Sequence, residues 1–544
     1  MKKKILSVII SFILIMLFAC DTDEDRYLVT ASLSQDAVDA GMKILDEGGS
    51  AMDAALSVAL SEIAVTGGKY ISYAGMLNVI YFEAETGKIH NMNAAFNTIQ
   101  NEEDPLTIPR ANYGTDTTRK IVDGRTILIP GFMKGVEEAH NKFGKIPFKN
   151  LFDNAIMIAE KGTVWTKFDD NAFWSGNYIF DKYPESKALF TKPDGSYYNI
   201  GDIFTQPELA KTLKKISIEG SDYMYRGKWA QKFVSAARNI GSKITLQDMK
   251  NYEVIWSDPV HGNYHGFDIY THGIPAFGGV TLIEALNLAE ISKLSEKEHY
   301  AKSTEALATL FQVLKASFYS SVEPKHFKDK IDLTTESRLK KATSKLIWEQ
   351  MLTNDETKNT RTNIFRNEHS AAIVAVDRGG NMVAMIHSIN TLNWGSNGLF
   401  VDGISIPDPA TFQQKMIHKV GPGKRLPDPT NPGIVIKDGQ PILGFSCIGR
   451  GLHNQTLTSL INILDFKMTP NESVETPTVG SISPYQGTLA LLIEPNKFSA
   501  DLIDKAKDLG IILLENSIVI SGYWTGIYRE AVTGKLRGTE VWLK

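Results

Sequence analysis

The sequence contains little cysteine and no excess of positive charge. Two cysteines among 544 residues exclude a disulfide-rich scaffold and a zinc site built from cysteine thiolates. Lys and Arg together number 58 against 62 for Asp and Glu, so no basic surplus predicts a nucleic-acid partner. The glycine pairs at 67–68 and 278–279 lack the strand–GxGxxG–helix context of a dinucleotide-binding motif. With no cluster of metal ligands and no phosphate-binding loop either, we expect no metal, no cofactor and no nucleic acid.

The overall composition is typical of a globular protein. Hydrophobic residues make up 43% of the chain and charged residues 22%, which excludes a wholly disordered chain and a polytopic membrane protein. At roughly 100–200 residues per domain, the length fits two to four domains or one large fold.

The first residues are typical of an export signal. Three lysines at positions 2–4 precede an almost entirely apolar run over 5–19, which is short for a transmembrane helix. The sequence at 17–20, Leu-Phe-Ala-Cys, resembles a bacterial lipobox, in which the cysteine is acylated and becomes the mature N-terminus. We predict a lipoprotein signal peptide over 1–20 and a lipid anchor on Cys20, rather than a plain signal peptide with an incidental cysteine. The protein is then exported and held at a bacterial membrane, in the periplasm or on the outer face.

The residue pattern predicts helices and strands throughout the mature chain. Helices are expected over 36–47, 50–60, 148–161, 228–239, 281–291 and 457–464. Strands are expected at 77–82 and in two buried hairpins, 371–376 with 382–386 and 433–436 with 442–445. The polar stretch 320–369 predicts an exposed loop region. Helices and hairpins in this order indicate an α/β protein with stacked sheets between helical layers.

Short motifs follow one another in a recognisable order from about residue 29 to the C-terminus. They include Gly48-Gly49-x-Ala51-x-Asp53-Ala54-Ala55, Ile129-Pro130-Gly131, Tyr225-Arg226-Gly227, Gly278-Gly279-Val280, Val376-Asp377-x-x-Gly380-Asn381 and Gly421-Pro422-Gly423-Lys424-Arg425. None is specific alone, but their order resembles the γ-glutamyltransferase (γ-glutamyltranspeptidase) family of N-terminal-nucleophile (Ntn) hydrolases.

The resemblance implies a fold and a maturation pathway. The family has a four-layer αββα sandwich and is made as one chain that cuts itself. Here the cut would give a large segment, 21–369, and a small segment, 370–544, which stay associated as one intertwined catalytic fold. The new N-terminal residue begins a central strand and acts as nucleophile, with its own α-amine as general base.

The resemblance also assigns the nucleophile and its neighbours. Counted back from Asp377, the family's nucleophilic threonine corresponds to Ser370, which predicts cleavage between His369 and Ser370. The threonine that activates the nucleophile corresponds to Ser388, and the substrate-contacting asparagine to Asn390. Because residues two apart on a strand share a face, Ser388 and Asn390 are expected to lie together. Serine is competent here, since its hydroxyl can attack the preceding carbonyl and needs the same proton acceptor as threonine.

The family's oxyanion hole corresponds to the segment Ser446-Cys447-Ile448-Gly449. Backbone N–H groups bind the oxyanion, so the amides of Ile448 and Gly449 are the candidates, although the family has glycine at both positions. Cys447 is interpreted as a buried packing residue, because activation of a thiol needs an electropositive partner.

The family's substrate-binding residues are mostly absent. The arginine that binds the γ-glutamyl carboxylate has no counterpart in 91–97, and a serine pair is replaced by Asp428-Pro429. Loss of a bidentate arginine removes the strongest carboxylate contact, which predicts a different acyl group. Asp408 is the candidate replacement for the acids that hold the substrate amine, and Arg425 or Arg450 for the lost cation.

Two aromatic residues and two alanines complete the comparison with the family. Trp394 and Phe400 either line an altered acyl pocket or pack in the core, and core packing is the favoured interpretation. Ala371 and Ala372 stand where the family has a threonine and a histidine.

The leading hypothesis is an autoprocessed Ntn amidohydrolase or acyltransferase that acts on a small-molecule amide. The substrate is either a γ-glutamyl amide such as glutathione or another acyl amide, an antibiotic-like amide being a minor variant. The alternative is a catalytically inactive surface lipoprotein that keeps the fold and binds a peptide or small molecule.

Overall fold

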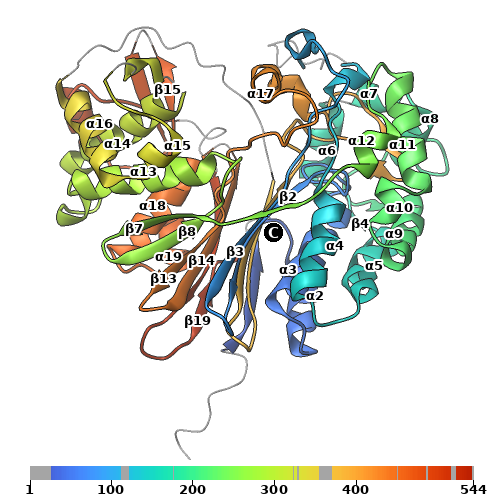
Figure 1. Cartoon of the computed structure of the whole chain (residues 1–544), viewed down its shortest axis with the longest axis horizontal. Helices are drawn as coiled ribbons and strands as arrows, with labels where there is room; N and C mark the ends of the chain where they lie inside the picture. Colours follow the sequence, from blue (N-terminus) through green and yellow to red (C-terminus); the bar gives the residue numbers. More distant parts are fainter. Residues whose placement is uncertain are drawn as a thin grey trace, which may run out of the picture.

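The computed structural model describes residues 26–111, 122–175, 177–322, 324–327, 330–353, 370–449, 451–485, 488–515 and 522–541. The predicted anchor Cys20, the processing residue His369 and Arg450 lie outside these ranges. Two β-sheets face each other between two layers of helices (Figure 1). The predicted four-layer αββα sandwich is confirmed.

The first sheet carries the predicted nucleophile strand near one edge. All of its strands pair antiparallel, in the order β1 (Leu28–Ala31), β9 (Ala371–Val376), β10 (Met382–Ser388), β2 (Met76–Glu83), β3 (Lys88–Ala94) and β6 (Ile255–Ser257). Every residue of β9 is buried, because this strand is paired on both edges and covered on both faces. The continuous apolar run that predicted β9 reflects this double coverage.

The second sheet faces the first across a thin apolar layer. Its antiparallel order is β19 (Leu536–Gly538), β18 (Gly522–Arg529), β14 (Gln440–Gly449), β13 (Gly433–Lys437), β8 (Phe267–Thr271) and β7 (Val260–Tyr264). Ile80, Val374 and Ile434 pack together between the sheets. The sheets approach so closely at Gly444 that a Cβ there would lie 2.8 Å from Val374 Cγ1.

Helices cover the outer face of each sheet (Figure 1). On the first sheet lie α3 (Ala51–Val65) and α4 (Phe132–Phe143), with α2 (Gln35–Asp46) and α5 (Asp153–Lys161) packed against α3. A capping box between Ser50 and Asp53 starts α3, which is buried along nearly its whole length. The second sheet is covered by α13 (Gly278–Ile291) and α18 (Leu452–Leu464), with α14 (Thr304–Val322) packed against α13.

The remaining elements are peripheral to the sandwich. They are α6 (Lys167–Trp174), α7 (Asn177–Phe180), α8 (Pro184–Leu189), α9 (Pro207–Glu219), α10 (Asp222–Tyr225), α11 (Lys228–Asn239), α12 (Leu246–Lys250), α17 (Gln414–Val420), α19 (Pro470–Glu475), α20 (Ala500–Asp508), β4 (Thr163–Val164), β5 (Ile203–Phe204), β11 (Phe400–Val401), β12 (Ile404–Ser405), β15 (Val479–Tyr485), β16 (Thr488–Ile493) and β17 (Ile512–Glu515). Across the described ranges, no helix is long and apolar enough to cross a bilayer.

The loop prediction for 320–369 is wrong where the structure describes that stretch. It contains α15 (Thr335–Arg338) and α16 (Lys341–Thr353), and α16 packs against α13. The Arg338 guanidinium is buried and pairs with Glu284 on α13, at 2.8 Å between Nε and Oε2. Because Glu284 lies 54 residues away, the local pattern around Arg338 looks exposed although it is not. The predicted helix at 148–161 also begins as a 3-10 turn over Phe148–Phe152 before α5.

Candidate active site

Ser370 lies immediately before β9, beside the last residue of β10. The antiparallel register pairs Ala371 with His387, which brings Ser370 next to Ser388. The Ser370 hydroxyl donates a hydrogen bond to Ser388 Oγ at 2.8 Å. The structure therefore brings together the two serines that the sequence proposes as nucleophile and activating residue, and Ser370 is half-buried.

The chain turns sharply after Ser388. The Asn390 backbone N–H donates to Ser388 Oγ at 3.0 Å, so this oxygen accepts from both Ser370 and the turn. Asn390 has a φ of 50° and its side-chain amide lies 3.0 Å from Met76 Sδ. The expectation that Ser388 and Asn390 share a strand face is wrong, because β10 ends at Ser388 and Asn390 adopts a left-handed turn conformation.

A buried acid and histidine lie behind the two serines. Glu62, on α3, accepts a hydrogen bond from the Leu33 N–H at 2.9 Å and lies 3.4 Å from His387 Nε2. Burial raises the pKa of Glu62 to about 8 and lowers the pKa of His387 to about 3. Burial therefore favours the uncharged form of both groups, and a neutral hydrogen bond between them over an ion pair. This contact ties α3 to β10 at the residue before Ser388.

The first strand of the chain also fixes the start of β9. The Ser32 N–H donates to the Ala372 carbonyl, and the Ala372 N–H donates to Ser32 Oγ, each at 3.0 Å. Together with the pairing to β10, these bonds leave the residue after Ser370 little freedom to move. The nucleophile candidate thus directly precedes a strand that is hydrogen-bonded on both edges.

The oxyanion candidates lie at the end of β14, the strand that faces β9 and β10 from the second sheet. Ile448 is fully buried in the apolar cluster that also contains Ala372 and Ile386. Gly449 has a φ of 81°, a conformation that favours glycine. Cys447 is buried in the cluster beneath α18, and burial raises the pKa of its thiol. Its surroundings fit a packing residue and offer no activation.

Other predicted site residues are engaged in structural contacts. Asp408 is fully buried and accepts hydrogen bonds from the Thr391 hydroxyl and, at 2.6 Å, from the Ser396 N–H. Trp394 and Phe400 pack in one aromatic cluster, as the favoured interpretation held. A role for Asp408 in binding a substrate amine stays a prediction.

Arg425 is also bound within the protein. Its guanidinium donates to the side-chain oxygens of Asn97 and Asn93, each at 2.7 Å, and lies 4.7 Å from the centre of the Tyr252 ring. A further bond goes to the Glu253 carbonyl. With its donors directed to these acceptors, Arg425 is a poor replacement for a substrate-binding cation.

A buried polar cluster that was not predicted from the sequence lies on the same face of the first sheet as Ser388, and its members are Asn78, Asn93, His272, Asp428 and Thr430. On β2, the residue opposite Ser388 is Met76, and Asn78 follows it two positions along, on the same face. Asn78 donates to Asp428 Oδ2 at 3.0 Å and to Thr430 Oγ1 at 2.9 Å. The signal was available: Asn78 interrupts an apolar strand.

Two atoms of this buried polar cluster have no partner within the part of the chain that the structure describes. They are Asn78 Oδ1 and His272 Nδ1. Burial also lowers the pKa of His272 to about 4, so its ring is neutral. Across the same residues, no three His, Cys, Asp or Glu side chains gather as a metal site.

Comparison with known proteins identifies the family. A family model described as gamma-glutamyltranspeptidase matches residues 37–539. The capsule biosynthesis protein CapD proenzyme of Bacillus anthracis is 29% identical over 447 residues, covering 81% of this chain and 75% of that protein. The glutathione hydrolase proenzyme of Escherichia coli (strain K12) is 25% identical over 471 residues, covering 82% and 80%. The crystal structure of cephalosporin acylase from Bacillus halodurans shares the fold, with a TM-score of 0.75 at 20% identity over 95% of this chain and 94% of that one. The chain therefore belongs to the gamma-glutamyltranspeptidase family and is a hydrolase or acyltransferase of that type.

Proposed function

We propose that the chain is a self-cleaving amidohydrolase or acyltransferase whose nucleophile is Ser370. The observation that carries the proposal is the 2.8 Å hydrogen bond from Ser370 Oγ to Ser388 Oγ, immediately before β9, a strand paired on both edges. The family assignment supports it, and so do the names of two relatives, both proenzymes.

Self-cleavage and catalysis would use the same hydroxyl. Ser370 Oγ attacks the His369 carbonyl carbon and loses its proton, the C–N bond breaks, and the departing nitrogen takes up that proton to become the free α-amine. Water then hydrolyses the resulting ester and releases the His369 carboxylate. In turnover the α-amine accepts the Ser370 hydroxyl proton as the oxygen attacks a substrate amide, and passes that proton to the leaving amine. Water or a second amine resolves the acyl-enzyme, while the Ile448 and Gly449 amides bind the oxyanion.

The proposed substrate is a small-molecule amide whose acyl group lacks the γ-glutamyl carboxylate. The segment 91–97 contains no arginine. The guanidinium of Arg425 donates its hydrogen bonds to Asn93, Asn97 and a backbone carbonyl. The buried Asp428 carboxylate accepts a hydrogen bond from Asn78, two residues along β2 from the residue opposite Ser388, and would repel a second carboxylate there. The names of two similar proteins, a glutathione hydrolase and a cephalosporin acylase, supply the first two substrate types to compare.

Intact-mass measurement of purified residues 21–544 tests the proposal directly. Two products are expected, residues 21–369 and 370–544, because the cut falls before Ser370. The measurement should follow incubation at neutral pH, with far-UV circular dichroism to show that the protein is folded. A folded chain that stays whole would replace the enzyme proposal with the alternative, a binding protein on an inherited enzyme fold.

We also propose that the mature protein is lipid-anchored through Cys20. The support is the lipobox-like sequence alone. A Cys20→Ala variant, expressed from the full gene, is expected to lose incorporation of radiolabelled palmitate and to leave the membrane fraction. Labelling of the variant at the parent level would contradict the anchor.

A further inference from the structure

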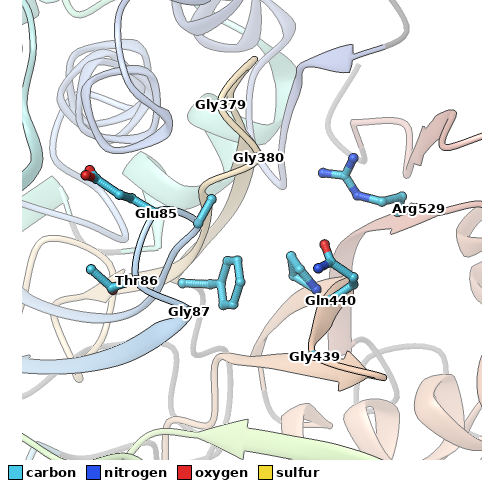
Figure 2. Close-up of a pocket in the computed structure, with 11 residues that line it drawn as sticks. Glu85, Thr86, Gly87, Gly379, Gly380, Gly439, Gln440 and Arg529 are labelled. Carbon is cyan, nitrogen blue, oxygen red and sulfur yellow. The ribbon is translucent and has the colours of Figure 1, made fainter.

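A groove lies at the end of the sandwich where hairpin turns of both sheets meet. It encloses about 470 Å³ and is lined by the turns that join β2 to β3, β9 to β10 and β13 to β14, and by the last residue of β18, Arg529. Figure 2 shows these turns converging on the groove from both sheets. Its volume is within the usual range for small-molecule sites.

The groove is separate from the candidate active site. Ser370 precedes β9, whereas Gly379 and Gly380, which line the groove, follow it. Six strand residues at ~3.3 Å each place the two sites on the order of 20 Å apart. Nothing in the proposed reaction uses the groove.

Arg529 is the cation of the groove, and it is half-buried. Its Nε is buried without a hydrogen-bond partner in the described part of the chain, and burial lowers the pKa of the guanidinium. The adjacent acid, Glu530, is bound to Arg537 at 2.7 Å and to Thr533 at 2.6 Å. Glu85 also lines the groove, but its carboxylate points away from it (Figure 2). Among the described residues, a partly desolvated guanidinium with an unbonded Nε is unfavourable unless a ligand supplies an acceptor.

The turns leave backbone and open space beside this cation. Gly87 and Gly439 have φ values of 69° and 77°, and a Cβ on either would meet no atom within 4 Å. The Gly87 N–H donates to the Glu83 carbonyl within its own turn, so these turns supply open space and the guanidinium supplies the hydrogen-bond donors. The fixed fork of an arginine suits the oxygens of a phosphate or carboxylate.

The position of the N-terminal strand favours phosphate. Because β1 is antiparallel to β9 with Leu28 opposite Val376, the chain enters the first sheet at the groove end. Leu28 lies eight residues after Cys20, a span of at most ~28 Å when extended. A lipid on Cys20 would therefore hold this end of the sandwich near the bilayer surface, which carries phosphate esters.

We propose that the Arg529 groove is a phosphate-binding site, occupied by a lipid head group or by free phosphate. The lipid source rests on the proposed anchor, whereas the site itself does not. The site goes beyond the proposed reaction and would hold in an uncut chain as well.

The test uses residues 21–544, which lack Cys20 and its lipid, and compares the parent with Arg529→Gln, Arg529→Lys and a matched control, Arg537→Gln, on the neighbouring strand. Binding of inorganic phosphate is measured by titration calorimetry, and binding to phosphatidylglycerol vesicles by co-sedimentation at low salt. The parent and the Arg537→Gln variant are expected to bind at least one probe, with at least tenfold weaker binding by Arg529→Gln and partial recovery in Arg529→Lys. Binding to vesicles alone assigns the lipid source, and binding of inorganic phosphate assigns free phosphate.

Two results would overturn the proposal: no binding of either probe by the parent, or equal binding by the parent and Arg529→Gln. All variants should show unchanged melting temperatures and unchanged cleavage before Ser370, because Arg529 lies outside the candidate active site. A failure of cleavage in the parent would count against the proposed enzyme and leave the phosphate site standing.

Discussion

Ser370→Ala is expected to remain a single polypeptide, whereas Ser370→Thr is cut like the parent. Alanine keeps the backbone and the buried surroundings of β9 but removes the oxygen that attacks the His369 carbonyl. Threonine keeps that oxygen and adds one methyl group. Any amidase activity of the parent should fall by ~10⁴-fold or more in Ser370→Ala, the scale seen when a nucleophile is removed. Intact mass and release of amine from a panel of acyl amides are the two measurements.

Ser388→Ala is the companion variant in the same experiment. It leaves Ser370 intact but removes the acceptor 2.8 Å from its hydroxyl and the partner of the Asn390 N–H. Slower rather than abolished cleavage is expected, which distinguishes an orienting role from a nucleophilic one. If Ser370→Ala is cut at the same bond and at the parent rate, Ser370 is not the nucleophile and the cleavage has another cause.

Glu62 is expected to contribute less and less to the stability of the folded protein as the pH rises from about 5 to 8. Its pKa is raised by burial to about 8, against an ordinary value of 4.5. Between these values the folded protein holds a proton that the unfolded chain releases, so rising pH favours unfolding. The stabilisation is fully present below about 4.5 and is lost as the pH passes through 8. The full change is on the order of 5 kcal/mol for a shift of this size.

Glu62→Gln should remove this pH dependence. Glutamine matches the size of the neutral acid, keeps an acceptor for the Leu33 N–H and offers a donor to His387. The difference in unfolding free energy between the variant and the parent should grow in favour of the variant from pH 5 to 8. The difference between the two proteins cancels the pH dependence that comes from His387, which is present in both. Because the pKa of His387 is lowered, its contribution to stability is lost toward acid pH.

Urea denaturation at several pH values provides these free energies, with every variant made in the uncut Ser370→Ala background so that unfolding is reversible. Glu62→Ala serves as the contrast, since it leaves the Leu33 N–H and His387 without their partner and should be less stable than Glu62→Gln at every pH. Parallel pH curves for the parent and Glu62→Gln would show that Glu62 is ionised in the fold, contrary to its burial.

The parts of the fold that were predictable are those whose signal is local. The apolar run of β9 and the turn before β10 predict a buried hairpin. Antiparallel pairing within that hairpin then places Ser388 beside the residue that precedes β9. The position of Ser370 itself came from the resemblance to a family. Asn390 was misplaced because no local signal marks the left-handed turn that ends β10 at Ser388.

The parts that were not predictable depend on partners far apart in the chain. The sequence around Arg338 predicts an exposed side chain, because its partner Glu284 lies on the distant helix α13. Glu62 lies on an apolar helix, and its partners Leu33 and His387 belong to other segments. The Arg529 groove is even harder to predict from the sequence. Each of its turns is visible as a glycine signal, but only the packing of one sheet on the other brings them together.

The order of strands in the two sheets changes what unfolding means for the cut protein. Strands before residue 370 flank β9 and β10 on both sides of the first sheet, and β7 and β8 complete the second. Cleavage before Ser370 would thus create a chain end without creating a subunit that can leave. Once denatured, however, the cut protein is two molecules whose reassembly depends on concentration, whereas the uncut precursor refolds as one. Self-cleavage would make folding a one-way step, after which the enzyme's lifetime is set by how slowly it unfolds.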